Sequence, residues 1–105
     1  MIFLIQDFQQ TGKASYYASR FDGRLTASGE VFSNDSLTAA HRSLPFGTMV
    51  EVSNQANGRS VILRINDRGP FIEGRIIDVT QKAARELGFY EKGLADVRIS
   101  LVEDT

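Results

Sequence analysis

The sequence predicts a single, mainly β domain that closes into a small barrel, with one short helix. Three observations support this prediction. Short runs in which apolar and polar residues alternate recur along the chain, and turn-forming glycine, asparagine and aspartate separate them. Residues 81–87 instead have apolar side chains at helical spacing. A chain of 105 residues has room for one core, so these features favour a small barrel over a doubly wound sheet.

The first half of the chain predicts one strand, a long loop and a hairpin. Residues 13–18 form a short strand with aromatic side chains, whereas residues 21–34 have the glycine, serine and asparagine of an ordered loop. Residues 48–53 and 60–65 alternate on either side of a turn at residues 54–58, which predicts the hairpin.

The second half predicts strand, helix and strand. Residues 75–79 form a short apolar strand. Thr80 can cap a helix over residues 81–87, and Gly88 follows as its stop. Residues 95–102 alternate again and form the closing strand, so the chain supplies five or six strands in all.

Composition excludes several classes of function. With 12 lysines and arginines against 13 aspartates and glutamates, the formal charge of −1 provides no global field for nucleic acid or an anionic membrane. The absence of cysteine and the single histidine exclude disulfides, thiolate chemistry and cysteine- or histidine-rich metal sites. Phosphate-loop, Gly-x-Ser-x-Gly and HExxH motifs are absent too. Carboxylate chemistry without a metal or cofactor remains.

The expected organisation is an N-terminal extension over residues 1–11, a barrel domain over residues 12–102 and a tail over residues 103–105. The apolar residues 1–5 are too few for a membrane span and lack the basic start and cleavage site of a signal peptide. We therefore expect a soluble monomer that makes no membrane contact of its own.

Residues 37–71 combine the chain's only histidine, His41, with Asp67, which ends an apolar run where a strand gives way to a turn. Together with Glu30 on the preceding loop, these residues are candidates for a functional site. Catalytic and binding residues are often found where a strand ends at the rim of a sheet or barrel. Each has a structural alternative: Asp67 can build the turn, His41 can be buried and Glu30 can be a solvated charge. If the three converge, His41 would position the carboxylates and tune them.

Asp78 is a second candidate acid. It interrupts a run of apolar residues on a strand that we expect to be buried, where a carboxylate must be protonated or strongly hydrogen-bonded. It either bonds backbone amides of the helix that follows or acts in catalysis, and both interpretations stay open. Carboxylates assisted by an imidazole suit the cleavage of glycosidic bonds.

Three long blocks match, in order, the motifs of a known family: GKASYYASRFDGRLTASGEVF, LTAAHRSLPFGTMVEVSNQANGRSVILRINDRGPF and GRIIDVTQKAARELG. Over residues 12–102 the chain thus resembles the rare lipoprotein A family of bacterial envelope proteins. The resemblance implies a six-stranded double-psi β-barrel, similar to that of expansins. It also implies a lytic transglycosylase that acts on peptidoglycan glycan strands stripped of stem peptides. The family's lipid-anchored cysteine is not in this chain.

By position, the resemblance places the family's glutamate, histidine and aspartate at Glu30, His41 and Asp67. Related barrel enzymes carry their acid at a position that resembles Asp78. We therefore take Asp67 as the first candidate for the principal acid and Asp78 as the second. Four further residues are expected to line the groove and hold sugar hydroxyls: Tyr17, Arg24, Ser28 and Arg68.

In the implied reaction, Asp67 or Asp78 protonates the glycosidic oxygen between N-acetylmuramic acid and N-acetylglucosamine. The same carboxylate then takes the proton of the muramyl C6 hydroxyl as a 1,6-anhydro ring closes. The alternative is a glycan-binding or wall-loosening module without turnover, as in expansins. The geometric criterion between the two is whether Glu30, His41 and Asp67 approach one another around an open groove. A third possibility, a scaffold for protein partners, would need a large exposed apolar patch.

Overall fold

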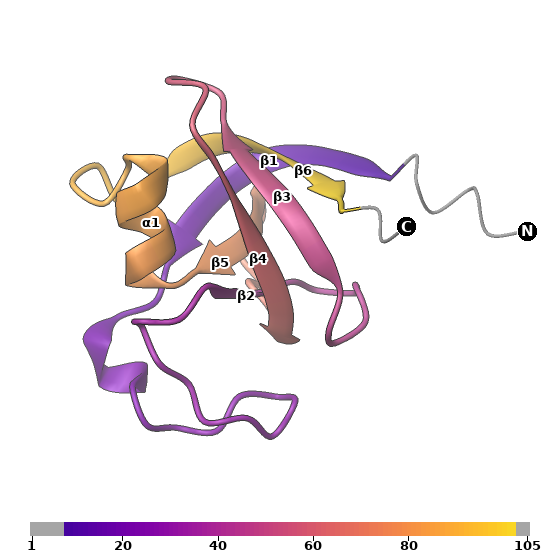
Figure 1. Cartoon of the computed structure of the whole chain (residues 1–105), viewed down its shortest axis with the longest axis vertical. Helices are drawn as coiled ribbons and strands as arrows, with labels where there is room; N and C mark the ends of the chain where they lie inside the picture. Colours follow the sequence, from indigo (N-terminus) through magenta and orange to yellow (C-terminus); the bar gives the residue numbers. More distant parts are fainter. Residues whose placement is uncertain (1–7, 103–105) are drawn as a thin grey trace, which may run out of the picture.

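The computed structural model describes residues 8–102. Part of the predicted N-terminal extension, residues 1–7, and the predicted tail, residues 103–105, lie outside the described residues. Within the described part the chain forms six strands, one α-helix and one 3-10 turn (Figure 1). Their bounds are β1 Gln9–Tyr16, η2 Ser19–Phe21, β2 Thr38–Ala40, β3 Met49–Asn54, β4 Ser60–Asp67, β5 Arg75–Val79, α1 Gln81–Leu87 and β6 Ala95–Leu101.

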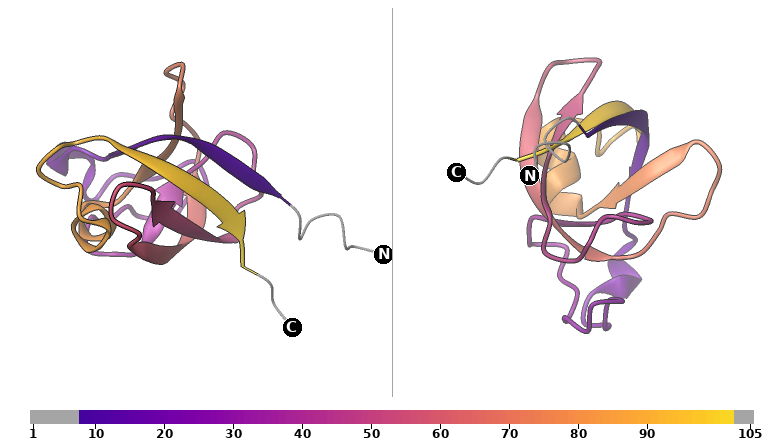
Figure 2. Two further views of the ribbon diagram at one scale, coloured as in Figure 1. Left: turned by 90° about the horizontal axis from the view of Figure 1, so that it is seen from above. Right: turned by 90° about the vertical axis from the view of Figure 1, so that its right-hand side faces the viewer.

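The strands close into a barrel in the order β1-β5-β2-β4-β3-β6, which confirms the predicted barrel. Two of the pairings are parallel, β1 with β5 and β2 with β4, and the other four are antiparallel. The helix α1 packs beside the barrel against β1 and β4. A long loop leads from β1 to β2 below the barrel in the view of Figure 1, and another loop joins β4 to β5 and projects from the barrel in the right-hand view of Figure 2. The site described below lies where these loops meet the wall.

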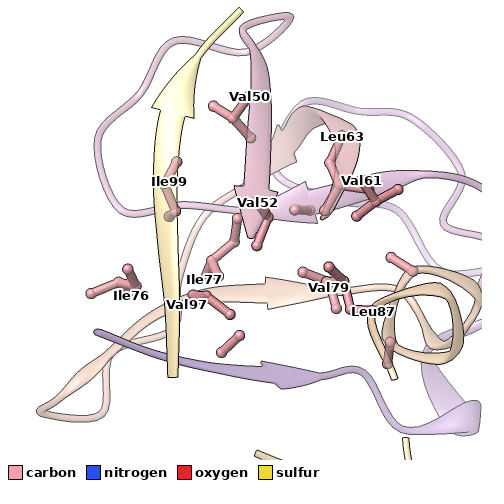
Figure 3. Close-up of a cluster of buried hydrophobic side chains, with 14 of the residues drawn as sticks. Val50, Val52, Val61, Leu63, Ile76, Ile77, Val79, Leu87, Val97 and Ile99 are labelled. Atoms are coloured by element: carbon pink, nitrogen blue, oxygen red, sulfur yellow. The ribbon is translucent and has the colours of Figure 1, made fainter. Parts of the chain in front are cut away.

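Apolar side chains from β3, β4, β5, β6 and α1 fill the interior of the barrel (Figure 3). Alternate residues of β3 and β4 point inward, as the alternation in the sequence predicts. Because an interior of six strands is just large enough for its own side chains, polar groups are left to the rim and the outer wall. The central buried residues are Val50, Val52, Leu63, Ile65, Ile77, Val79, Leu87, Val97 and Ile99.

The predicted helix and the strand before it are confirmed at their predicted bounds. The hydroxyl of Thr80 accepts a hydrogen bond from the backbone N–H of Ala83, which caps the helix. Gly88 ends the helix with φ +82°, a left-handed conformation that favours glycine. A Cβ atom at Gly88 would lie 2.7 Å from side-chain nitrogens of Asn57 and Arg59, so a larger residue here would also displace the ends of these two side chains.

Four of the five predicted strands differ in their bounds from the structure. The strand β3 is shifted by one residue and β6 ends one residue early, whereas β1 and β4 differ by more. The first strand begins at Gln9, inside the segment predicted as an extension, and ends at Tyr16 and not at Ala18. The strand β4 continues two residues beyond its predicted end, so Asp67 is the last residue of the strand and not part of a following turn. Alternation gave no signal at the start of β1 and at the end of β4 because the residues there, 9–11 and 66–67, are all polar.

The strand β2 was not predicted at all. Its three residues, Thr38–Ala40, are buried on both faces, so they show no period-two pattern. They form a strand because β4 and β5 bond to them from either side. The predicted loop over residues 21–34 is confirmed, apart from η2 and one isolated bridge between Leu25 and Val31. In residues 8–102 no helix has the length and apolar character needed to cross a membrane.

Candidate active site

Four residues lie side by side across the outer wall of the barrel, one on each of four adjacent strands. In spatial order they are Asp67 on β4, Ala40 on β2, Asp78 on β5 and Ser15 on β1. Paired positions on neighbouring strands project to the same face of a sheet. The two carboxylates therefore flank Ala40, with their Cα atoms about 10 Å apart, twice the usual strand spacing. Since the residue between them has only a methyl group, no bulky side chain separates them.

The carboxylate of Asp67 accepts three hydrogen bonds. Its Oδ2 accepts from the hydroxyl of Tyr17 at 2.6 Å, and its Oδ1 accepts from the backbone N–H of Ala27 at 2.8 Å and of Arg68 at 2.9 Å. Tyr17 directly follows β1, Ala27 lies further along the loop between β1 and β2, and Arg68 begins the loop after β4. Asp67 therefore fastens both loops to the barrel wall.

Tyr17 is a fixed hydrogen-bond donor to this carboxylate. Burial raises the pKa of its phenol above the usual tyrosine value, and the hydrogen bond to Asp67 and the negative charges of Asp67 and Asp78 raise it further. Its ring packs against Phe32 at a centroid distance of 4.2 Å and edge-on against Phe21 at 5.7 Å. The hydroxyl that we expected to contact sugar is thus engaged with Asp67.

This environment predicts the alkaline titration of the chain's three tyrosines. Followed by phenolate absorbance, Tyr17 is expected to ionise at a higher pH than an ordinary tyrosine, because burial and two nearby carboxylates disfavour the phenolate. The late phase should vanish in Tyr17→Phe and move to lower pH in Asp67→Asn. Ionisation of Tyr17 in the ordinary range would contradict the geometry described here.

Asp78 differs from Asp67 in its surroundings: Asp67 accepts three hydrogen bonds, and Asp78 accepts one from a side chain. Burial raises the pKa of its carboxyl group, and the charge of Asp67 raises it further, while a hydrogen bond from the Ser15 hydroxyl and the charge of Arg75 partly oppose the change. The predicted bonds from Asp78 to the following helix are wrong, because Thr80 caps that helix instead. Burial thus favours the protonated form of Asp78, as its position on an apolar strand predicts.

Glu30 lies near Asp67 but does not contact it. Its carboxylate accepts hydrogen bonds from Arg64 at 2.8 and 3.0 Å and from the side-chain amide of Asn66 at 3.0 Å. The bonds from Arg64 and then Asn66 lower the pKa of Glu30, so it stays ionised. Because Asn66 directly precedes Asp67, this ion pair ties the loop over residues 21–34 to β4 beside the site.

The ring of His41 does not join the carboxylates. Its Nδ1 accepts from the backbone N–H groups of Ser43 and Leu44, both at 3.1 Å. Because Nδ1 is an acceptor, Nε2 carries the proton and donates to Oε1 of Gln10 at 2.8 Å. Only the backbone of His41 reaches Asp67, through its N–H and the Asp67 carbonyl at 3.1 Å.

The environment of this histidine keeps it neutral. Burial first, and then the charges of Arg68 and Arg42, lower the pKa of His41. Both ring nitrogens of His41 are therefore engaged elsewhere. The sequence predicted that the side chains of Glu30, His41 and Asp67 converge, and the structure does not bring them together. It brings together Asp67, Tyr17 and Asp78.

The other expected sugar contacts have mixed surroundings. The guanidinium of Arg68 donates to the carbonyls of His41 at 3.2 Å and Leu44 at 2.8 Å, and it lies 4.1 Å from the ring centre of Phe46. Arg68 thus holds the chain after β2 in place. Ser28 is also engaged, since its N–H donates to the carbonyl of Asn66 and its hydroxyl bonds the hydroxyl of Thr26. The fourth, Arg24, is exposed on the loop surface.

Sequence reasoning missed Ser15, Ala40 and Asn66. Ala40 belongs to the unpredicted strand β2, and Ser15 meets Asp78 through a parallel pairing across 63 residues. No local pattern in the sequence marks such a register. Within residues 8–102 no three histidine, aspartate or glutamate side chains gather in a way that could hold a metal ion.

The family of the chain follows from comparison with known proteins. Residues 9–99 match the lytic transglycolase family. The chain belongs to this family. A probable endolytic peptidoglycan transglycosylase RlpA of Synechocystis sp. is 53% identical over 92 residues, which are 88% of this chain and 29% of that protein. The endolytic peptidoglycan transglycosylase RlpA of Neisseria meningitidis is 50% identical over 98 residues, 93% of this chain and 41% of the relative.

This member of the lytic transglycolase family therefore spans less than half the length of these two relatives. Its resemblance to the rare lipoprotein A family is confirmed. An expansin of Clavibacter michiganensis matches its structure with a TM-score of 0.73 at 20% sequence identity, over 93% of this chain and 52% of the expansin chain. That likeness concerns the fold, and with the closed six-stranded order it confirms the expected double-psi β-barrel.

Proposed function

We propose that this domain is the catalytic part of a peptidoglycan lytic transglycosylase. It cleaves the β-1,4 bond between N-acetylmuramic acid and N-acetylglucosamine and leaves 1,6-anhydromuramyl ends. The side chains of Glu30, His41 and Asp67 do not converge, so the geometric criterion set from the sequence is not met and does not support the proposal. The observation that carries it is instead the row in which Asp67 and Asp78 flank Ala40, Asp67 with three hydrogen-bond donors and Asp78 with a pKa raised by burial. Relatives about 50% identical that are named endolytic peptidoglycan transglycosylases support it.

In this proposal Asp78 is the general acid, which reverses the order expected from the sequence. A general acid must keep its proton near the operating pH, and burial raises the pKa of Asp78 in that direction. Asp67 accepts three hydrogen bonds, as a carboxylate anion does, and its charge is suited to stabilise positive charge at the anomeric carbon. The two carboxyl groups thus have different roles: Asp78 donates the proton, and Asp67 stabilises the positive charge.

The proposed reaction consumes no water. Asp78 gives its proton to the glycosidic oxygen, the bond from that oxygen to C1 of the muramyl residue breaks, and the N-acetylglucosamine end leaves as an alcohol. The C6 hydroxyl of the same muramyl residue then attacks C1 and closes the 1,6-anhydro ring. Its proton passes to the Asp78 carboxylate, which restores the acid. Since the nucleophile belongs to the substrate, a single acid-base group suffices.

Glu30 and His41 act through Asp67 in this scheme. The ion pair of Glu30 with Arg64 holds the loop that supplies the Ala27 N–H to Asp67. His41 orders the turn after β2 through its ring and bonds the Asp67 carbonyl through its backbone. Both are positioning residues, because neither side chain reaches the row of carboxylates.

The substrate in this proposal is a peptidoglycan glycan strand poor in stem peptides, and the place of action is the bacterial cell envelope. The domain acts as a monomer and requires no cofactor.

The deciding experiment incubates the purified domain with intact and with peptide-stripped peptidoglycan and analyses the soluble products by mass spectrometry. We expect 1,6-anhydromuramyl products, more of them from the stripped strands, and none with Asp78→Asn. Retained binding to glycan without any anhydro product would move the domain to the glycan-binding class. Reducing-end products in place of anhydro ends would indicate a hydrolase.

A further inference from the structure

The loop over residues 68–74 joins the two strands that carry the site carboxylates. It starts directly after Asp67 and ends four residues before Asp78. Its tip carries Phe71, whose side chain is 77% exposed, the highest value among the large apolar side chains of the described residues. The right-hand view of Figure 2 shows this loop standing away from the barrel. A single exposed apolar side chain is ordinary on a protein surface, so a binding role for this ring has to follow from its support and its position.

The backbone of this loop is held firmly. Arg42 donates from Nε to the carbonyl of Pro70 at 2.6 Å and from Nη2 to the carbonyls of Ile72 at 2.9 Å and Arg75 at 3.1 Å. The N–H of Arg75 also donates to the Ile72 carbonyl at 3.0 Å. Three guanidinium bonds to three carbonyls fix the path of the loop, so its exposed ring is presented on a preorganised support.

The position of the ring is defined as well. A Cβ atom placed on Gly69 would lie 3.6 Å from Cε2 of Phe71, so the aromatic ring packs back over this glycine. Gly69 is two residues after Asp67, and its φ of +121° favours glycine. The Cδ2–Cε2 edge of the ring thus lies against the chain beside Asp67, and most of the ring is open to solvent.

We propose that Phe71 is an aromatic platform that stacks against a pyranose ring of the glycan strand, beside the bond that is cleaved. This inference rests on the proposed function. A flat apolar ring complements the C–H face of a sugar ring, since aromatic side chains combine large contact area with fixed geometry. The strand from Arg75 to Asp78 spans about 10 Å, which places the platform next to the row of carboxylates and not within it.

The size of the exposed surface favours a sugar over a protein partner. Phe71 and its neighbour Ile72, 53% exposed, are the only large exposed apolar side chains of this loop. A stable protein interface needs about 800 Å² from each partner, far more than two side chains offer. A single stacked sugar ring needs no more than one aromatic face. The neighbouring sugars of the glycan make their contacts at Asp67 and Asp78.

The test measures binding of peptide-stripped glycan strands to the domain in the Asp78→Asn background, so that the strands stay intact. Phe71→Ala is expected to weaken binding about tenfold, while Phe71→Trp keeps the wild-type affinity and Phe71→Leu does not. In the active protein Phe71→Ala should raise KM by a similar factor. The matched control is Ile62→Ala, also exposed at 46%, which lies five residues before Asp67 on β4, about 17 Å away.

The outcomes separate the two proposals. Unchanged binding by Phe71→Ala, with anhydro products still formed by the wild type, would overturn the platform and leave the function standing. Binding that depends on Phe71 without any anhydro product would overturn the function and keep the platform. A loss of self-association in sedimentation, with glycan affinity unchanged, would assign the ring to a second copy of the chain. Equal melting temperatures of Phe71→Ala and wild type ensure that these comparisons concern folded protein.

Discussion

Replacing Asp78 with asparagine is expected to lower the rate of 1,6-anhydro product formation at least about 100-fold while the barrel stays folded. The amide has no acidic proton to give to the leaving oxygen. It keeps an oxygen that can accept from the Ser15 hydroxyl, so the local hydrogen bond survives. The measurement is the initial rate of anhydro product formation by mass spectrometry. Full activity of this variant would contradict the assignment of Asp78 as the acid.

The same substitution should not destabilise the domain at neutral pH. Burial raises the pKa of Asp78 above its unfolded value, so the folded state binds this proton more tightly. The stability from that proton is fully present below the unfolded pKa and is lost as pH rises through the folded pKa. At neutral pH, Asp78→Asn is therefore expected to melt at or above the wild-type temperature, and its advantage should shrink as the pH is lowered toward 4. A lower melting temperature at pH 7 would contradict this account.

Asp67→Asn is expected to lower both activity and stability. The carboxylate of Asp67 accepts from Tyr17, Ala27 and Arg68, and an amide leaves only one oxygen for these three donors. At least one donor then faces the NH2 group, which should cost about 1–3 kcal/mol in the free energy of unfolding. Turnover should fall about 100-fold or more, because the charge beside the anomeric carbon is lost and both loops loosen.

Chemical denaturation and the product assay together check this prediction. Asp35→Asn is the matched control, since Asp35 is an exposed aspartate on the long loop between β1 and β2 and bonds none of the donors of Asp67. It should leave both measurements unchanged. A variant of Asp67 with wild-type stability would contradict the anchoring contacts, and one with wild-type turnover would remove Asp67 from the mechanism.

The parts of the fold that sequence predicts well are those with local signals. Thr80 and Gly88 mark the two ends of α1 through a cap and a left-handed stop, and both were readable from residue type alone. The strand β2 has no such signal. Its residues become a strand only because β4 and β5 lie on either side, and those strands are more than twenty residues away in the sequence.

The site follows the same division. Asp67, Asp78 and Tyr17 were each selected from their residue type and position, and the structure brings all three together. The direction of the His41 ring was not predictable, because Gln10, 31 residues away, and two backbone amides determine it. The register that sets Ala40 between the two carboxylates depends on pairing between distant strands, which alternation in one strand does not reveal.

The row of Ser15, Ala40, Asp67 and Asp78 draws one residue from each of four strands, which are scattered along almost the whole length of the barrel sequence. The four residues become neighbours only when β1, β5, β2 and β4 pair in the order of the closed barrel. Under the proposed mechanism, a chain that has not yet closed its barrel therefore lacks the arrangement that cleaves glycan. If the proposed function holds, activity therefore appears together with the native state and is absent from partly folded chains.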